Sequence, residues 1–209
     1  MTRVIALAAS AVVVAALAAF YFMSGDTGGD RFAQCRQGQV AGGSSQIGGP
    51  FTLVNEQGET VTDQDVVDKP SLIYFGYTYC PDVCPLDVSR NAAAVEILEE
   101  RGEMVKPVFI SVDHERDTPE TLADFTANMH PRMVGLTGSP EQVKAASQAY
   151  RTFYQKQEPA EGDEDYYLVD HSTFTYLTLP EVGFVEFFRR EVGPEQMADR
   201  VECFMDAAE

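Results

Sequence analysis

The sequence is poor in positive charge and contains no tryptophan. Its 209 residues include 15 Lys and Arg against 33 Asp and Glu, which gives a formal net charge of −18. Binding to nucleic acid or anionic lipid draws on clustered Lys and Arg, and the sequence has no such cluster. The charge therefore opposes binding to both classes of partner, and a cation or a basic protein fits it better. The 13 Phe and 9 Tyr supply the aromatic core volume of a globular protein.

Histidine and cysteine are also scarce, so few side chains can bind a soft metal ion or carry thiol chemistry. The chain has 3 His and 4 Cys. If all the cysteines pair, they form two disulfides in one of three connectivities. Two of them, Cys80 and Cys84, lie four residues apart in "YFGYTYCPDVCP", directly after an apolar run. The others are Cys35 and Cys203.

The N-terminus carries a long uncharged segment, residues 4–23. At about 1.5 Å per helical residue it reaches about 30 Å, the thickness of a bilayer core, and it ends in the aromatic run 20–22. We expect a transmembrane anchor over residues 1–23. The alternative is a cleaved signal peptide, since residues 16–18 resemble a cleavage site. Both place the remainder outside the cytosol, and the anchor predicts a bacterial inner-membrane protein whose domain faces the periplasm.

Two regions follow this segment. Residues 24–49 are rich in Gly and Ser, which predicts a tether, and residues 50–209 form the folded domain. The domain starts with the hairpin signature "FTLVNEQGETVT", and "SLIYFGY" is typical of a strand buried on both faces. Strand and helix patterns then alternate, with helix starts at Pro85, Pro119 and Pro140. We predict an α/β domain with a partly parallel sheet, followed by two strands over 166–180 and 183–190 and a closing helix.

The Cys80 and Cys84 pair is chemically ambiguous when taken alone. If the two residues flank the first turn of a helix, both sulfurs lie on one side and the helix N-terminus favours thiolates. Such a pair suits a redox couple, a metal clamp or a static disulfide. Its position at the carboxyl end of a strand, where α/β sheets place their sites, argues against a purely structural disulfide.

His171, in "LVDHSTF", favours the metal clamp. We expect it at the start of a strand in the sheet that also carries the cysteine pair, so that all three side chains meet at one edge. Two thiolates and one imidazole form a soft donor set, which prefers Cu(I) or Zn to Mg or Ca. We interpret His114 and His130 as surface residues. Secondary copper candidates are Met129 and Met133.

Three separated segments, "YFGYTYCPDVCP", "SVDHERDTPE" and "YYLVDHSTFTYL", resemble the signature segments of the Sco/SenC family of membrane-anchored copper proteins. The resemblance spans residues 49–205. It implies a thioredoxin-like fold, with a central sheet flanked by helices, and copper, as Cu(I) or Cu(II), held by Cys80, Cys84 and His171. It also implies delivery of that copper to the dinuclear copper site of a cytochrome c oxidase subunit.

Two functions remain open for such a protein. The first is a copper metallochaperone, which would also need a thiol reductant or another copper carrier as a partner. The second is a thiol-disulfide oxidoreductase, in which Cys80 and Cys84 act as a redox-active catalytic pair that keeps the cysteines of the oxidase copper site reduced. Thioredoxin-type catalysts use C-x-x-C, whereas three residues separate the cysteines here. A peroxidase is a third and weaker option, because no single activated thiol stands out.

The chain departs from the family pattern at three positions. His114 occupies the place where the family usually has proline, and this removes no ligand. Cys35 and Cys203 lie outside the family motifs, and we predict a disulfide between them that ties the tether to the domain. The alternatives are that both stay reduced, or that Cys35 attaches a lipid or a partner.

Overall fold

The computed structural model describes residues 30–36, 46–159, 162 and 166–209. The chain divides into two compact units, residues 1–34 and 35–209. The predicted anchor lies outside the described residues, as does most of the predicted tether. Within the described ranges no helix is both long and apolar enough to cross a membrane.

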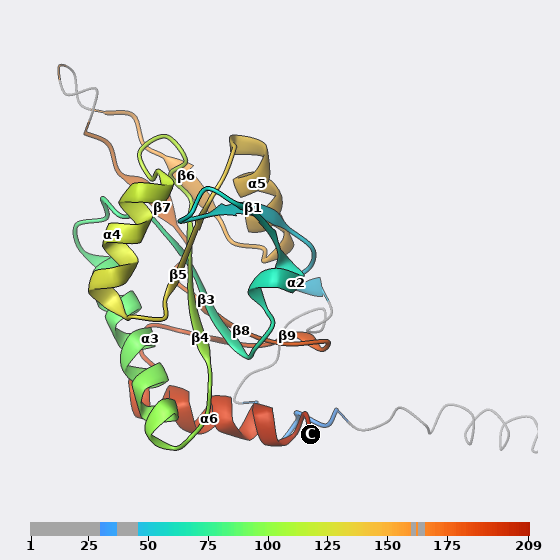
Figure 1. Ribbon diagram of the computed structural model, residues 1–209. Helices are drawn as coiled ribbons and strands as arrows, with labels where there is room; N and C mark the ends of the chain where they lie inside the picture. Colours follow the sequence, from blue (N-terminus) through green and yellow to red (C-terminus); the bar gives the residue numbers. More distant parts are fainter. Residues whose placement is uncertain (1–29, 37–45, 160–161, 163–165) are drawn as a thin grey trace, which may run out of the picture. The chain divides into compact units, whose positions relative to one another are not determined.

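Residues 35–209 form a mixed α/β unit around a seven-stranded sheet (Figure 1). Its three inner strands are parallel, and the strands added on both sides are antiparallel, so the predicted partly parallel sheet is confirmed. The strands, in spatial order, are β2 (Thr60–Thr62), β1 (Thr52–Asn55), β5 (Val134–Thr137), β4 (Lys106–Ser111), β3 (Ser71–Gly76), β8 (Thr175–Leu179) and β9 (Gly183–Phe188).

The inner strand β3 is buried along its whole length, as its continuous apolar sequence predicts. It pairs in parallel with β4 on one side and antiparallel with β8 on the other. Leu72, Ile73 and Phe75 are at most 1% exposed. Because both edges and both faces of β3 are covered, its carboxyl end at Gly76 is a rigid support for whatever follows.

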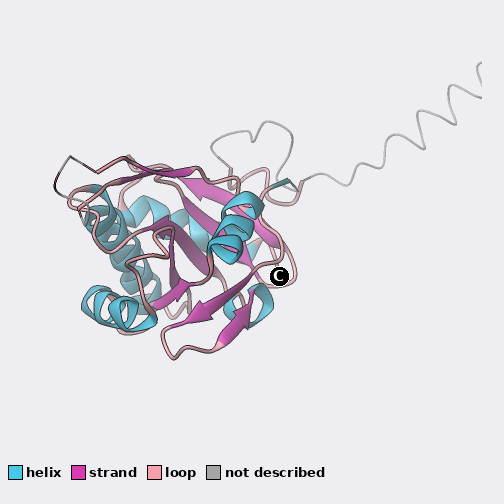
Figure 2. Ribbon diagram, turned by 90° about the horizontal axis from the view of Figure 1, so that it is seen from above, coloured by secondary structure: helices cyan, strands magenta, loops and turns pink. Residues whose placement is uncertain are grey.

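Helices lie on both sides of the sheet (Figure 2). Proline at the first helical position correctly predicts where two of them begin. The capping residues Thr118 and Ser139 accept hydrogen bonds from backbone N–H groups in the first turns of these two helices. The long helices are α3 (Val83–Glu100), α4 (Pro119–Met129), α5 (Pro140–Ala149) and α6 (Pro194–Asp206). Of these, α6 packs against α3.

The predicted N-terminal hairpin is present as β1 and β2, which pair antiparallel. The Asn55 side chain accepts hydrogen bonds from the backbone N–H groups of Gln57 and Glu59 across the turn, and Gly58 supplies the positive φ of 79° that the turn requires. One short helix, α2 (Asp63–Val66), follows directly and was not predicted. Its four residues begin at a capping box between Thr62 and Asp65.

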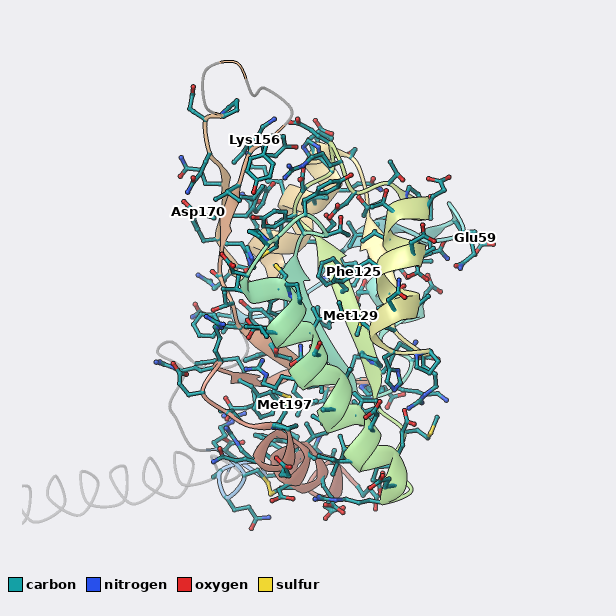
Figure 3. The ribbon with its side chains drawn as sticks, turned by 90° about the vertical axis from the view of Figure 1, so that its left-hand side faces the viewer. Glu59, Phe125, Met129, Lys156, Asp170 and Met197 are labelled. Carbon is teal, nitrogen blue, oxygen red and sulfur yellow. A yellow bond between two sulfur atoms is a disulfide. The ribbon has the colours of Figure 1, made fainter. Side chains whose placement is uncertain are left out.

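The expected strand placement of His171 is wrong in one respect. His171 ends β7 (Val169–His171), which pairs only with β6 (Tyr154–Lys156) in a separate two-stranded sheet among the described residues. Lys156 and Asp170 mark this sheet in Figure 3. Ser172 ends the pairing by exchanging hydrogen bonds with the backbone of Phe153, and the chain then crosses to β8. His171 therefore approaches the central sheet from outside it.

The predicted Cys35–Cys203 disulfide is confirmed. The two Cα atoms lie 5.7 Å apart, and 168 positions separate the residues in sequence. Cys203 belongs to α6, and Cys35 is buried at 5% exposure. The bond therefore fixes the start of this unit to its last helix.

Candidate metal centre

The cysteine loop links the carboxyl end of β3 to the first turn of α3. The backbone N–H of Cys80 donates to the carbonyl of Tyr77 and closes a turn. The Cys80 sulfur then accepts a hydrogen bond from the backbone N–H of Cys84, at 3.3 Å. Asp82, at the N-cap position, makes no such bond, so Cys80 satisfies a helix N–H that would otherwise lack a partner. The two cysteines flank the first turn of the helix, as predicted.

Gly76 allows the sulfur of Cys84 to reach the end of the strand. A Cβ atom added at this position would lie 2.9 Å from the Cys84 sulfur and 2.9 Å from a ring carbon of Tyr74. Real Cβ atoms do not make contacts this short, so a larger residue would displace the thiol. The sulfur of Cys84 thus lies close to β3 at Gly76, and Cys84 is 0% exposed.

His171 reaches the cysteines across the gap between the two sheets. Its Nε2 lies 3.2 Å from the Cys84 sulfur, and its Nδ1 lies 3.0 Å from the carbonyl oxygen of Ser172. A carbonyl can only accept, so Nδ1 carries the proton and Nε2 turns its lone pair toward the sulfur. The ring is held edge-on to Tyr74 and Tyr77, with centroid distances of 6.1 and 5.8 Å.

The three ligand atoms of Cys80, Cys84 and His171 all lie within 4.8 Å of one another. Throughout the part of the chain that the structure describes, no other group of three His, Cys, Asp or Glu residues meets in this way. Both cysteines are free thiols. The expectation that these three side chains meet is therefore correct in its geometry, although His171 arrives from a different sheet.

The two thiols differ sharply in acidity. A hydrogen bond from the Cys84 thiol lowers the pKa of Cys80 to about 3, against the opposing effect of burial. Burial, followed by the interaction with Cys80, raises the pKa of Cys84. The pair accordingly loses its first proton at Cys80, while the Cys84 thiol stays protonated and acts as a hydrogen-bond donor. Metal binding would release this second proton.

A family model described as SCO1/SenC matches residues 39–206. The chain belongs to the SCO1/SenC family. Its similarity to protein SenC of Rhodobacter capsulatus is 56% identity over 202 residues, which cover 97% of this chain and 89% of that protein. The Arabidopsis thaliana protein SCO1 homolog 1, mitochondrial, is 43% identical over 160 residues, which cover 76% of this chain and 47% of that longer protein.

Solved structures of the family have the same fold as this SCO1/SenC chain. The crystal structure of Arabidopsis thaliana ScoI with copper bound matches with a TM-score of 0.71 and 42% identity, and covers 77% of this chain and 99% of that one. Bradyrhizobium japonicum ScoI with copper bound matches with a TM-score of 0.67 and 36% identity, over 75% of this chain and 98% of that one. The mixed α/β fold with helices around a central sheet is thus that of the family.

The remaining candidates in this SCO1/SenC protein lie elsewhere. Met133 directly precedes β5, which runs parallel to β3, so it lies at the sheet edge opposite the cysteines, and it is buried at 7% exposure. Met129 ends α4, and its sulfur accepts from the Ser89 hydroxyl at 3.8 Å (Figure 3). His114 is partly exposed. The surface placement of His130 is wrong: it is 4% exposed, because the turn after α4 buries it beside Glu99 of α3.

Several residues around the site were missed. The Tyr74 hydroxyl donates to the buried carboxylate of Asp87 at 3.0 Å, and Arg190 donates to the other oxygen of Asp87. The sequence presents Tyr74 and Tyr77 only as part of an apolar strand, because periodicity does not distinguish a core tyrosine from one that lines a site. Asp87 is detectable in the sequence as the one charged residue among the first seven of α3, three positions after Cys84.

Proposed function

We propose that this protein is a copper metallochaperone, which binds one copper ion through Cys80, Cys84 and His171 and delivers it to the dinuclear copper site of a cytochrome c oxidase subunit. The observation that carries the proposal is the convergence of three soft donor atoms within 4.8 Å. Two solved relatives hold copper, which supports the choice of metal. The oxidase partner follows from the family resemblance.

The donor set fits Cu(I). Thiolate and imidazole are the ligand types that select this ion, and hard ions such as Mg²⁺ and Ca²⁺ require oxygen ligands instead. Cys80 is already the acidic thiol of the pair, and the Nε2 lone pair of His171 faces the sulfurs. The protein would therefore need to release only the Cys84 proton when the ion binds.

A copper ion held by three ligands would keep one coordination position open for a ligand from the acceptor protein. Cys84 is fully buried, whereas Cys80 is 6% exposed and His171 is partly exposed. An incoming ligand from the partner would thus approach from the side of Cys80 and His171, and Cys84 would release the ion last. Such stepwise exchange of ligands permits transfer without free copper.

A second candidate function is thiol-disulfide exchange with the oxidase copper site, and the free, acidic Cys80 thiol favours it. The Cys80 thiolate would attack a disulfide of the partner and form a mixed disulfide, releasing one partner thiolate. Cys84 would then lose its proton, attack Cys80, and release the second partner thiolate as Cys80 and Cys84 become a disulfide. The partner disulfide is reduced, and the pair here is oxidised by the same two electrons.

We further propose the arrangement of the chain in the cell. Residues 1–23 anchor the protein in the bacterial inner membrane, residues 24–49 form a tether, and residues 50–209 act in the periplasm. The Cys35–Cys203 disulfide supports an oxidising compartment, since such bonds persist outside the reducing cytosol.

The proposed delivery is tested by mixing the Cu(I)-loaded full-length protein, in detergent, with the metal-free, reduced copper-site domain of the oxidase subunit. We expect copper to appear in the acceptor after the two proteins are separated, also when a chelator that captures free Cu(I) is present during the mixing. A reduced acceptor that gains no copper would contradict the proposed carrier function. An oxidised acceptor that gains thiols from the metal-free protein would favour the exchange function instead.

A further inference from the structure

The loop between β4 and α4 supplies no metal ligand, although it holds the second of the three family segments, "SVDHERDTPE". Three of its side chains nevertheless point into the protein: Asp113, Arg116 and Asp117. Both carboxylates are buried, with exposures of 4% and 1%. Burial of a charged group is costly unless it is fully hydrogen-bonded, so the partners of these groups indicate what the loop does.

Asp117 binds the cysteine loop. One carboxylate oxygen accepts from the Thr78 hydroxyl at 2.6 Å, and the other accepts from the Thr78 backbone N–H at 3.0 Å and from the Ser111 hydroxyl at 2.5 Å. Thr78 lies two positions before Cys80, inside the segment that the Tyr77–Cys80 turn closes. Asp117 thereby joins the sulfur side of the site to the end of β4.

Asp113 binds the segment that leads to the imidazole. It accepts from the Tyr167 hydroxyl at 2.8 Å and from Arg116 Nε at 2.6 Å. Tyr167 lies two positions before β7, the strand that ends at His171, and is itself buried. Asp113 thereby joins the imidazole side of the site to the same end of β4.

Arg116 lies between the two sides. Its guanidinium carbon is 3.5 Å from the ring centroid of Tyr167, 4.9 Å from that of Tyr79 and 5.8 Å from that of Tyr77. Tyr167 belongs to the imidazole side, and the two other tyrosines belong to the cysteine loop. A cation that contacts aromatic rings on both sides stabilises their approach.

No strand ladder sets the distance between the sulfurs and the imidazole, so it depends on side chains together with the three-residue link from His171 to β8. The cysteines follow β3 in the central sheet, whereas β7 pairs only with β6 within the described ranges. Besides the three loop residues, the Tyr77 hydroxyl contacts the Val169 backbone across the same gap. A shift of β7 against β3 would break no main-chain pairing in the central sheet.

We propose that Asp113, Arg116 and Asp117 are positioning residues that form a bracket: Asp117 fixes the cysteine loop, Asp113 fixes Tyr167 and through it β7, and Arg116 holds the two together. The bracket sets the separation of His171 from the sulfurs. This inference rests on the proposed copper site and assigns a role to a family segment that contributes no ligand.

The imidazole side of the bracket is tested with Tyr167→Phe, which removes only the hydroxyl that Asp113 accepts from. Hydrogen-bond partners that orient metal ligands change metal affinity by 10- to 100-fold when lost, so we expect about a tenfold lower Cu(I) affinity in anaerobic competition with a chelator. In a His171→Ala background the same change should have no effect, because there is no imidazole left to position. The neighbouring Tyr166→Phe, on an exposed side chain, is the matched control and should leave both affinities unchanged.

The sulfur side is tested with Thr78→Val, which removes one of the bonds to Asp117 and keeps the backbone bond. We expect about a tenfold lower Cu(I) affinity both with and without His171, because the change displaces the sulfurs. Thr78→Ser keeps the hydroxyl and should restore the wild-type affinity. Thr137→Val removes a buried hydroxyl that has no hydrogen-bond partner among the described residues, and it serves as the control.

The outcomes separate the bracket from the proposed function. A wild-type chain that binds Cu(I) through His171 while Tyr167→Phe has no effect, or has the same effect with and without His171, would overturn the bracket alone. Thr78→Ser that binds as weakly as Thr78→Val would overturn it equally. A wild-type chain with no measurable Cu(I) affinity would overturn both proposals, since there would be no site to position.

Discussion

At the scale of single residues, the site depends on close contacts that tolerate no added atoms. Gly76 is the clearest case, since an added Cβ would meet the Cys84 sulfur at 2.9 Å and the Phe109 ring at 3.0 Å. We predict that Gly76→Ala lowers the free energy of unfolding by about 1–3 kcal/mol through overpacking. It should also weaken Cu(I) binding, because the sulfur can move more easily than the β3 backbone.

Urea unfolding of the reduced, metal-free variant measures the first effect, and Cu(I) competition measures the second. A variant as stable as the wild type, with the same Cu(I) affinity, would show that Gly76 is not needed for the approach of Cys84.

The individual ligands were predictable, and their supports were not. Cys80 and Cys84 are two of only four cysteines, and their spacing on a helix start already limits their geometry. Asp117 and Thr78 are 39 positions apart, and their hydrogen bonds leave no periodic pattern in the sequence. Local spacing therefore reveals a ligand pair, whereas a contact between distant loops appears only when both strands that carry them are placed.

At the scale of elements, the strongest predictions came from patterns that one segment contains by itself. The buried run of β3 and the capped starts of α4 and α5 need no partner to be recognised. β6 was missed because its three residues are too short for any periodicity, and its partner β7 was then assigned to the wrong sheet. Pairing between strands is a long-range property, and three-residue strands carry almost no signal for it.

His130 connects two elements and gives the protein a pH dependence. It follows the last turn of α4; its Nδ1 accepts from the backbone N–H of Arg132 at 3.2 Å, and its Nε2 lies 3.2 Å from Glu99 of α3. Burial lowers the pKa of His130 below its ordinary value of 6.5, against the opposing effect of Glu96. As the pH falls below about 6.5, the unfolded chain takes up this proton before the folded one, so stability is lost.

We predict that the free energy of unfolding, measured with urea at pH 8 and pH 5.5, falls toward the lower pH in the wild type. The fall should be smaller in His130→Asn, which keeps an acceptor near Arg132 but has no group that titrates in this range. An equal fall in both proteins would show that His130 does not contribute to it.

At the scale of the whole molecule, the Cys35–Cys203 disulfide closes most of the described chain into one loop. The bond joins residues that are 168 positions apart in sequence. In the chain-entropy model, a cross-link that closes a loop of this length stabilises the fold by up to about 5 kcal/mol. We predict that the double variant Cys35→Ser and Cys203→Ser unfolds at lower urea concentration. Its Cu(I) affinity should be unchanged, because neither sulfur belongs to the site.

Unfolding of both proteins under oxidising conditions, in buffer without thiols, measures the stability difference. Equal midpoints would mean that the bond does not constrain the unfolded chain. A parallel loss of Cu(I) affinity would mean that α6 supports the site, in conflict with the position of Cys80 and Cys84 at the end of β3.

The central claim is that His171 acts together with both sulfurs although it belongs to a separate sheet. Its most direct test is an anaerobic Cu(I) titration of the full-length protein and of His171→Ala against a competing chelator, with His114→Ala as the matched control. Because even the hydrogen-bond partners of ligands change metal affinity by 10- to 100-fold, loss of the ligand itself should lower the affinity by at least about 100-fold, and the control should match the wild type. Equal Cu(I) affinity in the wild type and in His171→Ala would contradict the three-ligand site.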